Sequence, residues 1–312
     1  MSTNKKQRQA YIGLILVTII IGLSFIFVKI GLRYAGAMDL LAHRFTAAAI
    51  SLVVLWFFGL IKLPRFSFKK AKSLLLLSLF YPLLFFALQT FGLQYSSASE
   101  AGIVFATTPI ITLIAASVFL KEKTNLLQKI GIILSIIGIL YIIYFTGGVS
   151  GSASLLGIIL LLLSVFSLVV YYVLGKVVSA NFSAMEITVW MTILAFIVFN
   201  GFSVATHVNN NTLGQFFSPF IYMEFLWSVL YLGVLSSMLT AFLTNFALTQ
   251  IPASQIAVFN NLSPMVSIAG GILILNETLF AYHIIGGLLV VAGVVMTVFF
   301  KYKNPKKIIN KK

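Results

Sequence analysis

The chain has 312 residues, of which 60% are hydrophobic and 9% are charged, and its mean hydropathy is +1.08. An ordinary soluble domain has about 45–50% apolar and about 25% charged residues, so this composition excludes a water-soluble class. The chain has no cysteine, which excludes disulfides, thiolate chemistry and cysteine-ligated metal sites.

Ten long apolar stretches follow one another along the chain. A helix that crosses the hydrocarbon core needs about 20 mainly apolar residues. Continuous apolar runs of this length are typical of helices, whereas barrel strands alternate apolar and polar residues. The sequence therefore predicts an all-α integral membrane protein of ten transmembrane helices. They are expected near residues 11–31, 37–60, 72–94, 99–120, 127–146, 154–178, 184–206, 223–248, 253–274 and 280–301.

The first stretch has some features of a secretory signal. A basic start precedes an apolar run, and Ala35-Gly36-Ala37 imitates a cleavage site. However, the apolar run is longer than a typical signal core, and Lys29 and Arg33 precede that site. We therefore expect this segment to remain as the first transmembrane helix.

The net charge of +15 is explained by membrane topology and does not require a nucleic-acid partner. If the N-terminus is cytoplasmic, every Lys and Arg except Lys29, Arg33 and Arg44 falls in or beside a cytoplasmic loop or tail. The positive-inside rule then predicts a multi-pass protein of the cell (plasma) membrane with both termini in the cytoplasm. The basic tail 304–312 is expected to contact anionic membrane lipids. The oligomeric state stays open, a monomer included.

The two halves of the chain repeat each other at a constant offset of 155 residues. The least common residue types that match at this offset are Pro109 with Pro264, Glu122 with Glu277, Gly131 with Gly286 and Gly138 with Gly293. These matches indicate a duplication, with residues 1–148 as the first repeat and residues 149–303 as the second. Each repeat holds five helices, an odd number, so the second enters the membrane from the opposite side. The repeats are therefore predicted to be inverted, with an insertion between residues 207 and 220.

Several segments carry a recognisable pattern in both halves. They are Gly22-Leu23-Ser24-Phe25, Arg44-Phe45, Leu93-Gln94-Tyr95-Ser96-Ser97-Ala98, Leu120-Lys121-Glu122, Ile251-Pro252-Ala253-Ser254 and Leu275-Asn276-Glu277. With these segments the chain resembles the drug/metabolite transporter superfamily, and in particular its EamA-type members. The resemblance implies a ten-helix transporter of small organic metabolites, often an exporter of amino acids, related compounds or drugs. One departure is Ile21, because many relatives carry Trp at this position, so that aromatic contact is missing here.

Two cations are expected inside the membrane. Lys29 lies about five residues from the outer end of the first helix, roughly 7 Å deep, and Arg44 lies at a similar depth in the second. Because buried charges are costly, each needs a partner or a role. Both are candidate ligands for a substrate carboxylate. The alternative is that they pair with one of the acids Asp39, Glu100 and Glu186, or extend to the outer interface.

Uncharged polar residues give a second set of candidates. Gln89 on the third helix and Asn245 on the eighth lie on polar helix faces. Asn260 and Asn261 on the ninth helix have only Phe105-Ala106 as counterparts, so this polarity belongs to one half. These amides are candidate substrate-binding groups, and hydrogen bonding between helices is the alternative.

Aromatic residues and prolines complete the candidate site. Tyr171, Tyr172 and Trp190 are candidates for the wall of a cavity near the membrane midplane. Pro109 and Pro264 remove helix hydrogen bonds at equivalent positions, and we interpret them as paired hinges that close opposite ends of the pathway.

The pattern as a whole favours a secondary transporter that exports small metabolites by alternating access, with a passive channel or facilitator as the alternative. A channel typically needs filter loops or charged rings, and none stands out in the sequence. An enzyme is disfavoured because His43, His207 and His283 are far apart and no metal or phosphate motif occurs, so no cofactor is expected. A structural role is disfavoured because the loops are too short for an effector domain. No acid lies near a helix midpoint, so proton coupling and facilitation both stay open.

Overall fold

The computed structural model describes residues 3–61, 68–119, 125–149, 152–251, 256 and 263–299, and the elements within these ranges are helices joined by turns. The first half contains α1 (Thr3–Gly31), α2 (Ala37–Phe57), α3 (Phe68–Ser78), η1 (Leu79–Leu84), α4 (Phe85–Tyr95), α5 (Ala98–Phe105), α6 (Thr108–Phe119) and α7 (Leu126–Val149). The second half contains α8 (Ser152–Val178), α9 (Ala184–Asn209), η2 (Leu213–Gln215), η3 (Ser218–Ile221), α10 (Met223–Leu230), η4 (Tyr231–Leu239), α11 (Thr240–Gln250), α13 (Ser263–Leu275) and α14 (Ala281–Phe299).

The predicted all-helical membrane class is confirmed for the described residues. Eight helical segments are long and apolar enough to cross a membrane, and Ser263–Leu275 and Ala281–Met296 are shorter apolar helices. Backbone groups in hydrocarbon have no water to bond, so apolar runs of this length are stable as helices. The sequence also determines where α5 and α9 begin. Capping boxes formed by Ser97 with Glu100 and by Ser183 with Glu186 satisfy the first free amides of these helices.

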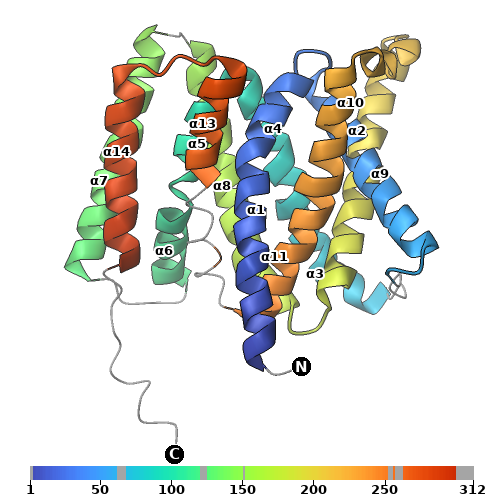
Figure 1. Cartoon of the computed structure of the whole chain (residues 1–312), viewed down its shortest axis with the longest axis horizontal. Coiled ribbons are helices and arrows are strands. Elements are labelled where there is room, and N and C mark those ends of the chain that lie inside the picture. The colour runs from blue at the N-terminus through green and yellow to red at the C-terminus, as the bar shows by residue number, and fades with distance from the viewer. Residues whose placement is uncertain are drawn as a thin grey trace, which may run out of the picture.

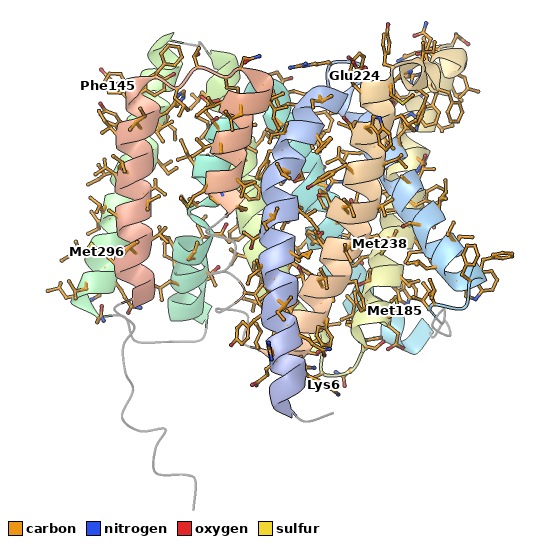
Figure 2. All side chains as sticks on the ribbon, in the orientation of Figure 1. Lys6, Phe145, Met185, Glu224, Met238 and Met296 are labelled. Carbon is orange, nitrogen blue, oxygen red and sulfur yellow. The ribbon has the colours of Figure 1, made fainter. Side chains whose placement is uncertain are left out.

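The helices run between two faces of the molecule (Figure 1). Figure 2 places Lys6, Met185 and Met296 at one face and Phe145 and Glu224 at the other. The start of α1 and the end of α14 therefore lie on the same side. α7 and α14 form a pair at one edge of the bundle, and α4 and α8 pack together in its interior.

Glycines bring α7 and α14 into close contact. A Cβ atom added to Gly138 would lie 2.7 Å from the carbonyl oxygen of Gly286, and one added to Gly286 would lie 2.8 Å from that of Gly138. A Cβ atom on Gly293 would likewise collide with the backbone of Gly131. Small residues allow helix backbones to approach in a membrane, where burial of apolar surface gives no driving force between helices.

Two long spans contain a π-helical segment in their middle. The span Lys72–Tyr95 contains η1, and the span Met223–Gln250 contains η4. Residues 79–84 of η1 correspond to residues 234–239 of η4 at the offset of 155. Pro82 lies inside η1 and removes one helix hydrogen bond there, while η4 has no proline. Each half of the chain therefore has an irregular helical segment at the corresponding position.

A short segment between α9 and α10 covers one end of α2. It contains η2 and η3, and it is where the sequence indicates an insertion. His43 of α2 donates a hydrogen bond from Nε2 to the carbonyl oxygen of Phe216 at 2.8 Å, and the two rings lie 4.3 Å apart. Nearby, Asp39 accepts hydrogen bonds from Ser203 at 2.5 Å and from His207 at 3.1 Å. These contacts fasten α2 to α9 at this face.

Candidate functional site

A buried cavity lies between the two halves of the chain, at the depth of η1 and η4. Its lining is mainly aromatic and aliphatic, with several hydroxyls and one amide: Ile21, Ser24, Tyr81, Phe85, Phe86, Gln89, Phe105, Thr108, Leu168, Tyr171, Tyr172, Ser236, Thr240, Thr244 and Ser263. The space in which the centre of a water molecule fits is about 20 Å³, enough for one or two waters. This space is smaller than a metabolite, so the cavity has to widen before one can bind.

The π-helical segments contribute two residues that sequence reasoning missed. Tyr81 of η1 and Ser236 of η4 both line the cavity and are 155 residues apart. Irregular segments of this kind occur often at functional sites, because they redirect backbone and side-chain groups. The one signal available beforehand was Pro82, a proline inside an otherwise helical stretch.

Tyrosines form one wall of the cavity. Tyr171 and Tyr172 of α8 are both buried and both line it, and Tyr171 stacks on Tyr81 with ring centroids 4.5 Å apart. The Tyr171 hydroxyl donates to Asn245 Oδ1 at 2.8 Å, and Asn245 Nδ2 donates to Thr188 at 3.0 Å. Asn245 is thus placed behind this wall, where it orients Tyr171, and it is not among the cavity-lining residues.

Gln89 of α4 does line the cavity, as its polar position suggested. The residue is buried, and its Oε1 atom has no hydrogen-bond partner among the described residues. A buried acceptor without a partner is costly, so it is available to a donor on a ligand.

Arg44 of α2 is the buried cation closest to this cavity. It is 1% exposed, and its Nε and Nη2 atoms donate to the hydroxyls of Ser237 at 2.6 Å and Ser236 at 3.0 Å. Its guanidinium carbon lies 3.9 Å from the ring centroid of Phe86. Ser236 and Phe86 both line the cavity, so the guanidinium borders it.

Pairing with an acid was one alternative for the two cations: among the described residues Arg44 has no such partner, whereas Lys29 lies near Glu100 and Glu277. Asp39 pairs with His207, Glu100 lies 3.4 Å from His283, and Glu186 caps α9. Each of these carboxylates finds a local hydrogen-bond donor, which makes a distant Lys or Arg unnecessary.

Lys29 instead bonds the end of a helix. Its Nζ atom donates to the carbonyl oxygens of Leu93 at 3.0 Å and Ser96 at 2.8 Å, where α4 ends. These carbonyls have no partner within the helix, and a cation there also matches the helix dipole. Lys29, which the sequence made a candidate for substrate binding, therefore bonds the end of α4 in this conformation.

A polar pocket opens beside Lys29. The space in which the centre of a water molecule fits is about 600 Å³ in this pocket. Its lining includes Glu100, Glu277 and His283. The Glu277 carboxylate accepts hydrogen bonds from the backbone amides of Ala98 at 2.7 Å and Ser99 at 2.9 Å. Glu277 thus caps the first turn of α5 in the other half of the chain.

The remaining candidates lie away from the cavity or outside the described residues. Trp190 is half-buried on α9 and is not a lining residue. Pro109 is in the first turn of α6, after the helix is interrupted at residues 106–107, and Pro264 is in the first turn of α13. Asn260 and Asn261 lie outside the described residues.

Comparison with known proteins gives consistent matches over the chain. A sequence model of the EamA-like transporter family matches residues 8–144 and again residues 155–299. The uncharacterized transporter YcxC of Bacillus subtilis is 42% identical over 290 residues, which cover 93% of each chain. The uncharacterized transporter YetK of the same organism is 27% identical, over 96% of this chain and 90% of its own.

A solved crystal structure of a protein has the same fold. It superposes with a TM-score of 0.60 over 96% of this chain and 98% of its own, at 13% sequence identity. At that identity the likeness concerns the fold alone. The family match over both halves and the 42% identity to a transporter along almost the whole chain identify this multi-pass membrane protein as a member of the EamA-like transporter family.

Proposed function

We propose that this protein is a secondary carrier that moves small organic solutes by alternating access, with export as the physiological direction. In this proposal ten helices cross the plasma membrane, both termini are cytoplasmic, and the central cavity is the substrate site. The observation that carries the proposal is the central cavity itself, which residues of both halves line beside the two π segments.

Pairs of equivalent contacts support the inverted repeat. The contact of Gly138 with Gly286 corresponds to that of Gly293 with Gly131 when each residue is exchanged for its counterpart 155 positions away. The π segments η1 and η4 also correspond at this offset. Two similar halves packed around one site can rock against each other and expose the site to each side in turn.

Counterflow in proteoliposomes tests the carrier mechanism. The purified chain is reconstituted into proteoliposomes. These are loaded in turn with unlabelled amino acids, organic acids, nucleosides and cationic drugs, and uptake of the same compound in labelled form is measured. A carrier gives saturable uptake that is accelerated by unlabelled substrate on the opposite side. Uptake that rises linearly with concentration, with no acceleration, would indicate the channel alternative.

The topology is testable with single cysteines, because the natural chain has none to remove. Gly214 lies in the segment between α9 and α10, and a Cβ atom there has no neighbour within 4 Å. Asn181 is exposed in the turn between α8 and α9. In intact cells an impermeant maleimide should label G214C and leave N181C unlabelled until the cells are opened. The reverse pattern would refute the proposed orientation.

A further inference from the structure

No described group neutralises the charge of Arg44. Its described partners are two neutral hydroxyls and two aromatic rings, and its Nη1 atom is buried with no hydrogen-bond partner among the described residues. A buried cation without a counter-ion is costly, even where hydroxyls satisfy part of its donor capacity. This cost needs an explanation that packing alone does not give.

No described carboxylate is available to Arg44. Four acids have the local donors described above, and the fifth is exposed in the first turn of α10. These acids are Asp39, Glu100, Glu186, Glu277 and Glu224. An anion that balances the guanidinium therefore has to come from outside the described part of the chain.

The fold does not require a cation at this position. Lys29 and Asp39 correspond to Lys176 and Glu186 at an offset of 147, and the same offset relates Arg44 to Met191. Met191 is as deeply buried on α9 as Arg44 is on α2. One half therefore accommodates an uncharged side chain of similar length where the other half has a guanidinium.

We propose that the central cavity binds a small organic monoanion, whose carboxylate is held by Arg44. This inference rests on the proposed function, since it names the substrate class of the same site. Nη1 provides a free donor for one carboxylate oxygen. The Ser236 hydroxyl accepts from Nη2, so its own proton is available to the second oxygen. Charge-assisted bonds of this kind are about twice as strong as bonds between neutral groups.

The rest of the lining sets the remaining chemistry of the ligand. Tyr81, Phe85 and Tyr171 offer flat apolar surfaces to the body of the molecule. The lining contains no Asp, Glu, Lys or Arg, so Arg44 is the one charge bordering the cavity among the described residues. A single carboxylate attached to an apolar or aromatic body fits this arrangement, and a dianion does not.

Matched pairs of probes test the inference. Phenylacetate, 3-phenylpropanoate and 4-methylpentanoate are compared with their primary amides, which keep the shape and remove the charge. Binding is measured by thermal stabilisation of the purified full chain in detergent, and transport by counterflow. We expect the wild-type protein to bind the carboxylates at least tenfold more tightly than the amides.

Variants of Arg44 assign the preference to this residue. R44M introduces the residue that the other half has at the equivalent position, so we expect it to fold. It should lose the carboxylate preference and keep its affinity for the amides. R44K should retain part of the preference, and S236A should weaken carboxylate binding severalfold. R33Q removes an exposed arginine outside the cavity and should leave the preference unchanged.

The outcomes separate this inference from the proposed function. Equal affinity for carboxylates and amides, no binding of any carboxylate, or a preference that survives in R44M would each overturn the inference. Counterflow of any solute in the same preparations would still support a carrier. Conversely, carboxylate binding that depends on Arg44 without counterflow would support the binding site and refute the carrier mechanism.

Discussion

Lys29 and Lys176 make the same contacts in opposite halves of the molecule. Lys29 Nζ donates to the carbonyl oxygens of Leu93 and Ser96, and Lys176 Nζ donates to those of Leu248 at 2.6 Å and Ile251 at 3.0 Å. The accepting residues correspond at the offset of 155. Each lysine thus connects the first helix of its half, α1 or α8, to the end of a π-containing span. That span ends with α4 in the first half and with α11 in the second.

The first prediction concerns these two lysines. K29M should destabilise the protein by about 1–2 kcal/mol, because two helix-terminal carbonyls lose a charged donor. K176M should have a smaller effect, because Lys176 is more exposed and water can replace it. Thermal unfolding in detergent measures both. K6M, in the exposed start of α1, is the control. Full stability of K29M would show that its carbonyl contacts are not structural.

The second prediction concerns the glycine contact of α7 with α14. G138A should lower the thermal stability clearly, since its Cβ atom would lie 2.7 Å from a backbone oxygen of the other helix, which cannot move aside independently. G201A on α9 is the matched control, because its Cβ atom has no neighbour within 4 Å. Alanine is the better helix former, so G201A should be neutral or stabilising by roughly 0.5–1 kcal/mol. Equal effects of the two variants would contradict the close packing.

The third prediction concerns the bond between Tyr171 and Asn245. Y171F should destabilise by about 1–3 kcal/mol, because it leaves the buried Asn245 Oδ1 atom without its donor. Adding N245L to Y171F should recover part of that loss, since both polar partners are then replaced by apolar groups. A double-mutant cycle of unfolding measures the coupling. Additive effects would mean that Asn245 does not orient Tyr171.

The fourth prediction concerns the proline hinges. Both prolines are in the first turn of a helix, where a missing amide costs little, so P109A and P264A should fold with nearly unchanged stability. If these sites flex during the transport cycle, each variant should lower the maximal counterflow rate severalfold while substrate affinity stays the same. Unchanged rates in both variants would refute the hinge interpretation.

Local patterns in the sequence predicted local structure well. Apolar runs predicted the helical stretches, and the starts of α5 and α9 follow from the local pairs Ser97 with Glu100 and Ser183 with Glu186. The glycines that match between the halves lie where α7 and α14 come into close contact. Each of these features depends on residues that are near in sequence or that match in both repeats.

Contacts between segments far apart in the chain could not be predicted from the sequence. The hydroxyls that bind Arg44 are 192 and 193 residues away from it, and no spacing rule connects them. Hydropathy does not distinguish a π segment from a regular helix, so Tyr81 and Ser236 were missed. Asn245 was correctly recognised as a buried polar group on a helix face, but the sequence did not reveal that Tyr171 lies between it and the cavity.

The contacts of the segment with η2 and η3 should stabilise closure of the molecule at their own face. An alternating-access cycle with equivalent halves would have inward-open and outward-open states of nearly equal free energy. Here His43 of α2 bonds the carbonyl oxygen of Phe216, and the two rings are in tilted contact at this face. Each 1.4 kcal/mol that these contacts contribute shifts the ligand-free population tenfold toward closure at that face. In the proposed carrier cycle, the ligand-free protein should therefore favour the state in which the site is accessible from the opposite side.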